Sequence, residues 1–218
     1  NIRINGDIQI SNCSTLVFDH ANITLNGNIH INNGKIILRH STLSIQNAKG
    51  DYCLNILNAP SIRIENTTID CNSKCGFLNQ ESGQLKLQNS TIKNSNIGYA
   101  ICFTGNSADI NTSTFENCKN GALFNHASKE LFIASCNFIN CINVHGGAIH
   151  SRSIADTTVY NCNFHNCHAQ YIGGAVYFVN LKYGQSVIHC NFQNCTPADS
   201  VLFNVENQDD SLPTRRKP

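Results

Sequence analysis

The chain has 218 residues, of which 41% are apolar and 13% are charged, so it is long enough for one large domain with a hydrophobic core. Its 15 Lys and Arg are balanced by 14 Asp and Glu, and a net charge of +1 argues against a nucleic-acid partner or an acidic membrane surface. The longest apolar runs, such as residues 97–103, are far shorter than the roughly 20 residues of a membrane helix, so we expect no membrane insertion. No apolar leader opens the sequence, and we expect any signal peptide to have been removed.

Taken in chain order, apolar residues mark a repeat with a loose period. Each repeat is centred on one residue, here called the anchor, and successive anchors are 20 to 28 residues apart. The anchors are Ile23, Leu43, Ile69, Ile92, Phe115, Phe138, Phe164 and Phe192. Repeats of this length are typical of solenoid proteins, in which each repeat packs against the next one.

Two kinds of strand signal accompany the anchors. Before several anchors, apolar and polar residues alternate over a few positions, which predicts a strand with one buried face; these stretches are residues 61–66, 84–89 and 130–135. After the anchors come short apolar stretches, most of them opened by a glycine that permits a tight corner; they are residues 76–78, 98–102, 121–124, 146–150, 173–178 and 200–203. The sequence lacks the periodicity of an amphipathic helix.

These signals predict an all-β fold, a single-stranded right-handed parallel β-helix that forms a solenoid of about nine coils. We expect it to span residues 1–207 and to be followed by an irregular C-terminal tail at 208–218, where prolines and a basic stretch interrupt any strand pattern. Coils of such a solenoid stack at about 4.8 Å, so equivalent residues form columns. A sandwich of short strands is the competing prediction, and it requires no such columns.

Three columns are expected from the residues around the anchors. Two positions before each anchor the side chain is small, and we expect it to point inward, with cysteine acting as a small hydrophobe; this column is Ala21, Ser41, Thr67, Ser90, Ser113, Cys136, Cys162 and Cys190. Two positions after the anchor we expect an inward ladder of hydrogen-bonded amides, formed by Asn94, Asn117, Asn140, Asn166 and Asn194. A second cysteine column follows directly, at Cys118, Cys141, Cys167 and Cys195.

The chemistry of the cysteines bears on both function and location. A zinc site needs ligands that converge on one point, whereas these cysteines repeat along an axis by translation, so we expect no metal and no cofactor. Disulfides between stacked neighbours are compatible with the roughly 4.4–6.8 Å Cα separation of such a bridge, and a packed ladder of free thiols is the alternative that we favour. The 12 cysteines suggest an oxidising compartment, and buried thiols in a cytosolic protein are the alternative.

Two motifs occur together in the C-terminal half of the sequence. GGAI stands at Gly146 to Ile149 and GGAV at Gly173 to Val176, each after an F-x-N-C motif, at 138–141 and 164–167. They resemble the repeats of the chlamydial polymorphic membrane proteins, surface and autotransporter proteins marked by FxxN and by GGA followed by Ile, Leu or Val. Here asparagine stands one place early, and cysteine stands where that family has asparagine. The resemblance covers about residues 115–205 and implies a surface β-helix with a role in adhesion.

Other β-helix proteins, such as pectate lyases and polygalacturonases, are enzymes that act on polysaccharides. Their catalytic groups are acidic and basic side chains clustered on one face of the protein, and this sequence contains two candidate clusters. Asp70, Lys93 and Glu116 each follow an anchor, and a lysine between two carboxylates could abstract a proton from a uronate. A salt-bridged surface ladder is the alternative that we favour. The second cluster is His145, His150, Arg152 and Asp156 near the GGA strand, for which simple polarity at a corner is the alternative.

The sequence therefore favours a non-catalytic protein, secreted or at the cell surface, that resembles an adhesin. We expect a glycan or a cell-surface protein to bind along an exposed sheet face, although fold alone does not determine function. A polysaccharide lyase, hydrolase or epimerase of the pectate-lyase-like class is the first alternative. A structural spacer or fibre module is the second.

Overall fold

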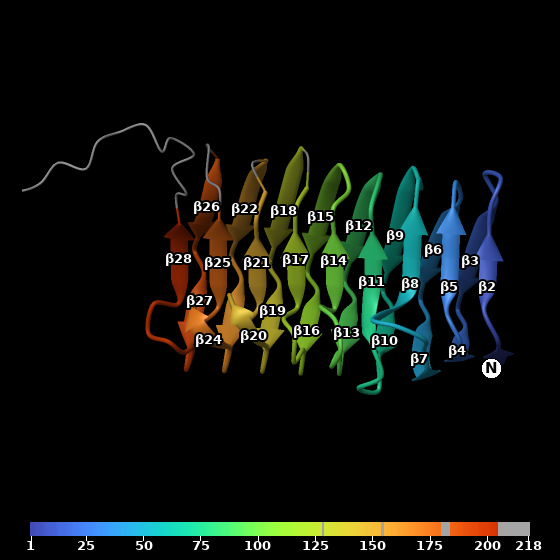
Figure 1. The fold of residues 1–218 in the computed structure, drawn as a ribbon, viewed down its shortest axis with the longest axis horizontal. Helices are drawn as coiled ribbons and strands as arrows, with labels where there is room; N and C mark the ends of the chain where they lie inside the picture. The colour runs from blue at the N-terminus through green and yellow to red at the C-terminus, as the bar shows by residue number, and fades with distance from the viewer. Residues whose placement is uncertain (128, 154, 180–183, 205–218) are drawn as a thin grey trace, which may run out of the picture.

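The computed structural model describes residues 1–127, 129–153, 155–179 and 184–204, so the predicted tail at 208–218 lies outside the described residues. Within these ranges the chain forms β-strands and no helix. The strands wind into a parallel β-solenoid of about nine turns, which advances along one axis from the N-terminus to the last described strand (Figure 1). The predicted all-β solenoid is confirmed, and the sandwich alternative is wrong.

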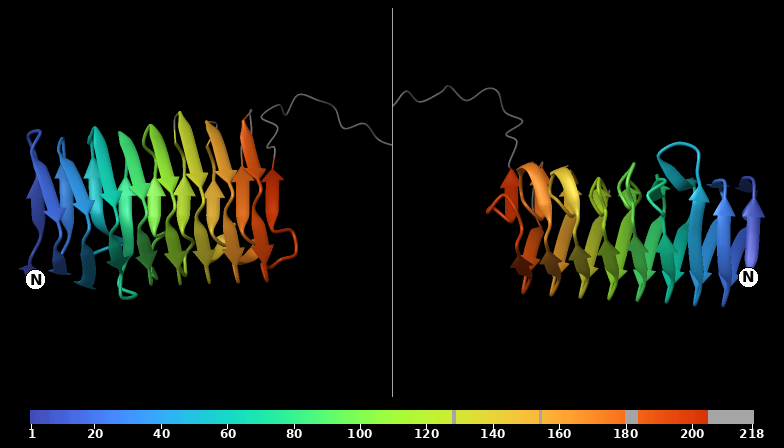
Figure 2. Two further views of the ribbon diagram at one scale, coloured as in Figure 1. Left: turned by 180° about the vertical axis from the view of Figure 1, so that it is seen from behind. Right: turned by 90° about the horizontal axis from the view of Figure 1, so that it is seen from below.

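Three long parallel sheets form the three faces of the solenoid (Figure 2). Among the described residues, two of them have nine strands and the third has eight. We number the sheets in the order in which the chain enters them. The strands of sheet 1 are β1 (Ile2–Asn5), β4 (Asn22–Asn26), β7 (Thr42–Asn47), β10 (Thr68–Asp70), β13 (Thr91–Lys93), β16 (Thr114–Glu116), β19 (Asn137–Ile139), β23 (Asn163–His165) and β27 (Asn191–Gln193).

Sheets 2 and 3 contain the two kinds of strand that were expected after and before the anchors. The strands of sheet 2 are β2 (Ile8–Ile10), β5 (Ile29–Asn32), β8 (Tyr52–Leu57), β11 (Gly76–Gln80), β14 (Ile101–Phe103), β17 (Leu123–Asn125), β21 (Ile149–Ser151), β25 (Val176–Val179) and β28 (Val201–Asn204). Those of sheet 3 are β3 (Thr15–Asp19), β6 (Lys35–Arg39), β9 (Ser61–Glu65), β12 (Gln84–Gln88), β15 (Ser107–Asn111), β18 (Glu130–Ala134), β22 (Asp156–Tyr160) and β26 (Gln185–Ile188). A small additional sheet pairs β20 (Ile142–His145) with β24 (His168–Ile172).

The anchors form one continuous column in sheet 1. The strand register pairs each anchor with the next, from Ile23 with Leu43 to Phe164 with Phe192. Because the register is unbroken, the unequal spacing of the anchors along the sequence comes from corners of unequal length. The aligned columns predicted from the period are confirmed.

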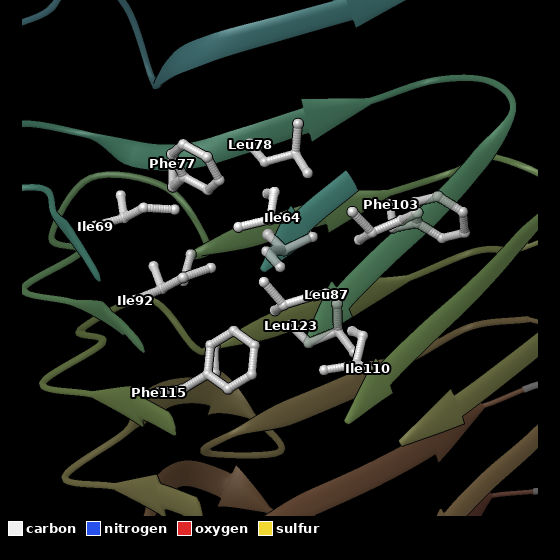
Figure 3. Close-up of a cluster of buried hydrophobic side chains, with 14 of the residues drawn as sticks. Ile64, Ile69, Phe77, Leu78, Leu87, Ile92, Phe103, Ile110, Phe115 and Leu123 are labelled. Atoms are coloured by element: carbon white, nitrogen blue, oxygen red, sulfur yellow. The ribbon is translucent and has the colours of Figure 1, made fainter. Parts of the chain in front are cut away.

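Apolar side chains from all three sheets meet along the axis and fill the interior. Figure 3 shows Ile69, Ile92 and Phe115 of sheet 1 stacked one above another, facing side chains of the other two sheets. The phenylalanine rings continue this column, with centroids 5.1 Å apart for Phe115 and Phe138 and 4.8 Å apart for Phe138 and Phe164. Parallel, closely packed rings of this kind make each coil dependent on its neighbours for burial of its core.

Two of the corners are built from residues in the left-handed backbone region. At these positions φ lies between 46° and 57°, a conformation that asparagine and other short polar residues tolerate best. The corner from sheet 3 to sheet 1, here the 3–1 corner, is formed by His20, His40, Asn66, Asn89, Thr112, Ser135, Asn161 and His189. The corner from sheet 1 to sheet 2, here the 1–2 corner, contains Asn94, Asn117, Asn140, Asn166 and Asn194.

The GGA motifs lie where successive corners approach each other closely. A Cβ atom on Gly147 would lie 2.4 Å from the carbonyl oxygen of Gly174, and one on Gly174 would lie 2.5 Å from that of Pro197. Gly146 has a φ of +60° and equally little space, with the carbonyl oxygen of Ile149 at 2.1 Å. The motif is therefore explained by close backbone packing in the solenoid, without reference to a ligand.

Candidate functional site

A groove of about 630 Å³ runs along the outer face of sheet 3, across β9, β12, β15 and β18. Side chains alternate between the two faces of each strand. In β12, Leu85 and Leu87 point inward, and Lys86 between them lies on the outer face. The side chains that give the groove its chemistry are Arg63, Gln84, Lys86, Asp109, Glu130 and Phe132.

The strand register arranges these side chains in two adjacent columns. Arg63, Lys86, Asp109 and Phe132 occupy equivalent positions in successive coils. In the neighbouring column Glu130 is paired with Ser107, so it lies diagonally across from Asp109. The groove thus presents two cationic side chains, two carboxylates and an aromatic ring within four coils.

Several of these groups have no partner among the described residues. Arg63 Nε donates to Glu65 Oε1 at 2.6 Å, and Asp109 accepts a hydrogen bond from the Asn111 amide. Lys86 and Glu130 form no ion pair, and the Gln84 amide no hydrogen bond, with any other described residue. Exposed polar groups without partners beside an aromatic ring are suited to a polar ligand.

The predicted column of Asp70, Lys93 and Glu116 lies on the outer face of sheet 1, with the three residues in register. Lys93 Nζ is 3.6 Å from Asp70 Oδ2, while Asp70 Oδ1 accepts from the backbone N–H of Asn72 and from the Asn94 amide, both at 2.9 Å. Glu116 forms no ion pair with the described residues. The Asp70 carboxylate is held by these structural contacts, which favours the surface ladder over catalysis.

The structure separates the second predicted cluster into two parts. His145 and His150 lie close together on the sheet 2 side, with ring centroids 6.0 Å apart, and the charge of Arg152 acts on His150. Asp156 instead begins β22 on sheet 3, where it is paired with Glu130. The predicted grouping of Asp156 with the histidines is therefore wrong, because the corner after Arg152 carries the chain to another face.

Aromatic residues missed in the sequence complete the histidine cluster on sheet 2. Tyr99 Oη and His150 Nδ1 are 3.2 Å apart, and the Asn143 amide donates to Tyr99 Oη at 3.0 Å. The rings of Phe124 and Tyr177 each lie 5.4 Å from that of His150. Nδ1 of His145 is buried and has no hydrogen-bond partner among the described residues. The cluster is a packed layer of aromatic rings on the sheet 2 side.

Packing against these rings changes the titration of His150. Burial, with smaller contributions from the charges of Arg152 and His145, lowers the pKa of His150 from 6.5 to about 4. In the unfolded chain the ring protonates near its ordinary value, whereas the folded protein keeps it neutral. A neutral His150 is thus part of the native structure above about pH 4.

We expect His150 to make the protein less stable in mild acid. As the pH falls from 6.5 to about 4, the unfolded state binds a proton that the native state does not, which lowers the free energy of unfolding by about 1–2 kcal/mol after allowance for solvent screening. The His150→Phe variant should lack this component, since Phe124 already occupies the equivalent position of the preceding strand. Urea unfolding at pH 7, 5.5 and 4 measures the difference. If the free energies of unfolding of the wild type and of His150→Phe changed equally with pH, the conclusion that native His150 stays neutral would be contradicted.

Six of the eight residues in the predicted column of small residues are buried, while Ala21 and Cys190 are partly exposed. The column has a hydrogen-bonding role that the sequence did not reveal. Ser90 Oγ donates to the carbonyl oxygen of Gln88 at 2.7 Å and accepts from the N–H of Thr67 in the preceding coil at 3.1 Å. Cys162 Sγ makes the same two contacts, with the Tyr160 carbonyl at 3.3 Å and the Cys136 N–H at 3.4 Å. The interpretation of these cysteines as mere hydrophobes is therefore incomplete, because their thiols replace hydroxyls at the 3–1 corner.

The remaining columns are present, and one of them is displaced from the interior. The amides of Asn117, Asn140 and Asn166 each donate to the asparagine of the preceding coil, at 3.0 to 3.2 Å. They lie half-buried or exposed at the 1–2 corner, so the expected inward placement is wrong. Asn194 has the same backbone conformation. Cys118, Cys141, Cys167 and Cys195 follow in the next column, and each thiol donates to the carbonyl two residues earlier.

All 12 cysteines are free thiols. Most are buried, and Cys13 is the exposed one.

Comparison with known proteins leaves the chain without a family assignment. It matches no family model, no curated protein and no solved structure. Among the described residues, no helix offers the length and apolar character needed to cross a membrane. What is established is a parallel β-solenoid of about nine turns, with a groove of about 630 Å³ on the outer face of sheet 3 and smaller hollows elsewhere on its surface.

Proposed function

We propose that this chain is a non-catalytic, adhesin-like module, secreted or at the cell surface, that binds a glycan along the groove of sheet 3. The observation that carries the proposal is the groove itself, with Lys86, Glu130 and Gln84 exposed and without partners in the described structure. The proposed location rests on the resemblance of residues 115–205 to repeats of surface proteins.

The chemistry of the groove favours a glycan as its ligand. Sugar hydroxyls both donate and accept hydrogen bonds, and the groove offers amide, hydroxyl, carboxylate and ammonium groups to match them. The half-buried ring of Phe132 provides an apolar surface beside these groups, on which the C–H face of a sugar can pack. The groove extends across several coils, so it fits an extended oligosaccharide better than a single small molecule.

Binding to a glycan array, followed by affinity measurement with the best glycan, tests the proposal. We expect Lys86→Ala and Phe132→Ala each to weaken binding at least about tenfold, which corresponds to about 1.4 kcal/mol. Lys119→Ala, which removes an exposed lysine at the 1–2 corner, should leave binding unchanged. An array without binding, or equal affinities for all three variants, would contradict a glycan-binding groove and favour a structural spacer or fibre module.

The enzymatic alternative is supported by one specific feature of the same groove. Asp109 and Glu130 are two carboxylates on adjacent strands, offset by two positions. Diagonal backbone positions on neighbouring strands are separated by roughly 7–8 Å, and side chains that start at this separation can place their carboxyl groups at the roughly 6.5–9.5 Å that inverting glycosidases use. A polysaccharide lyase, hydrolase or epimerase would use this pair in preference to the ladder on sheet 1.

A matched activity screen separates these functions. Ultraviolet absorbance of unsaturated products from polyuronates detects a lyase, and release of reducing ends detects a hydrolase. The binding-module proposal expects neither. An activity that Asp109→Asn and Glu130→Gln abolish would establish the enzymatic alternative, whereas one abolished by Lys93→Ala in a folded protein would assign catalysis to the sheet 1 ladder.

A further inference from the structure

A pair of histidines meets an aspartate at the start of the 3–1 corner. β3 ends at Asp19 and β6 ends at Arg39, and these two residues are paired in register. His20 and His40 follow them, with φ angles of 50° and 49°. The same backbone turn therefore presents both imidazoles outward, one coil apart, and their rings stack with centroids 4.6 Å apart.

Both rings direct the same nitrogen toward one oxygen of Asp19. Oδ1 of Asp19 is 2.8 Å from His20 Nδ1 and 3.5 Å from His40 Nδ1. One ligand atom from each of the three residues lies within 4.8 Å of the others. In a tetrahedral zinc site with bonds of about 2.0–2.1 Å, neighbouring ligand atoms are roughly 3.3–3.4 Å apart, so small side-chain rotations bring the three atoms to coordinating distances.

Neighbouring side chains hold the aspartate and one histidine in place. Arg39 Nη2 donates to Asp19 Oδ2 at 2.9 Å, which fixes the carboxylate and leaves Oδ1 facing the imidazoles. His40 Nε2 is 3.2 Å from Asn66 Nδ2, and Asn66 Oδ1 accepts a hydrogen bond from the Asn89 amide at 2.5 Å. When His40 Nδ1 binds a cation, Nε2 carries the proton, and the amides of Asn66 and Asn89 turn over together so that Asn66 Oδ1 accepts a hydrogen bond from Nε2. Polar neighbours that orient metal ligands in this way commonly strengthen metal binding.

We propose that Asp19, His20 and His40 form a surface binding site for a divalent transition cation of the zinc class. Two imidazoles and a carboxylate favour Zn²⁺, Cu²⁺ or Ni²⁺ over Mg²⁺ or Ca²⁺, which prefer oxygen ligands. The side chains of His20 and His40 are 74% and 45% exposed, so water can complete the coordination sphere. This inference is independent of the glycan proposal, because none of the three residues lines the groove, which begins at β9, the strand next to β6.

The column itself supplies conservative variants for a test. Asparagine occupies the 3–1 corner at Asn66 and Asn89, so His20→Asn and His40→Asn should preserve the turn. His189 occupies the same corner, but the residue before it is Ile188 in place of a carboxylate, so His189→Asn is the matched control. A Cys13→Ser background removes the exposed thiol.

Calorimetric titration with Zn²⁺, and the visible absorption of Co²⁺ as a second probe, measure the site directly. We expect one ion per chain at this site, an affinity at least about tenfold weaker in either His20→Asn or His40→Asn, and no change in His189→Asn. Binding should also weaken on acidification, since the cation replaces protons on the imidazoles. No saturable binding up to about 1 mM, or the same affinity in the double His20→Asn, His40→Asn variant, would overturn the proposal.

Discussion

Replacing Phe138 by alanine is expected to lower the free energy of unfolding by about 3–5 kcal/mol. Phe138 is fully buried, and its ring is stacked between those of Phe115 and Phe164 at 5.1 and 4.8 Å. The backbones of the coils above and below are held apart by the parallel strand pairing, so they cannot collapse into the space that the ring leaves. Urea unfolding followed by circular dichroism measures the loss.

The matched control for this substitution is Phe132→Ala. Phe132 is a phenylalanine on the preceding strand of the same coil, but it lies half-buried on the outer face of sheet 3. Its removal should change stability by less than about 1 kcal/mol. Equal losses for the two variants would contradict the assignment of the anchor column to the core.

Substitutions of Cys162 should follow an order set by hydrogen bonding and by space. Serine keeps a donor for the Tyr160 carbonyl and an acceptor for the Cys136 N–H, so Cys162→Ser should cost less than about 1 kcal/mol. Alanine leaves both backbone groups without that partner and should cost about 1–2 kcal/mol. Leucine overfills a narrow interior shared with adjacent coils, at about 1–3 kcal/mol or more.

The order of the serine and alanine variants is the informative result. If the cysteine were only a small hydrophobe, alanine would be tolerated at least as well as serine. Ser90 and Ser113 occupy the column in other coils with the same contacts, which is why we expect serine to be the better substitute. Unfolding in urea under reducing conditions distinguishes the two outcomes.

The sequence was sufficient to predict the architecture because burial repeats once per coil. Every anchor from Ile23 to Phe192 lies in the predicted column, since apolar residues at a regular spacing have few other ways to be buried together. The asparagine column was also found, but its position was wrong. Asparagine at a fixed place in each repeat is a signal for a left-handed corner, and that signal was available in the sequence.

The groove on sheet 3 could not be found in the same way. Lys86, Asp109 and Phe132 are adjacent in space but about one repeat apart in sequence, and they share no residue type. Recognising them requires the register of sheet 3. The cluster of Asp19, His20 and His40 depends likewise on the stacking of two corners.

Counting thiols in the denatured, unreduced protein tests the central structural claim most directly. The account holds that all the cysteines are free, that Cys136, Cys162 and Cys190 substitute for serine and threonine in a stacked column, and that no cysteine is needed as a crosslink. It predicts that nearly all 12 cysteines react with a thiol reagent in denaturant without prior reduction. Labelling of only a few cysteines, rising to the full number after reduction, would contradict this account and establish a solenoid stabilised by disulfides.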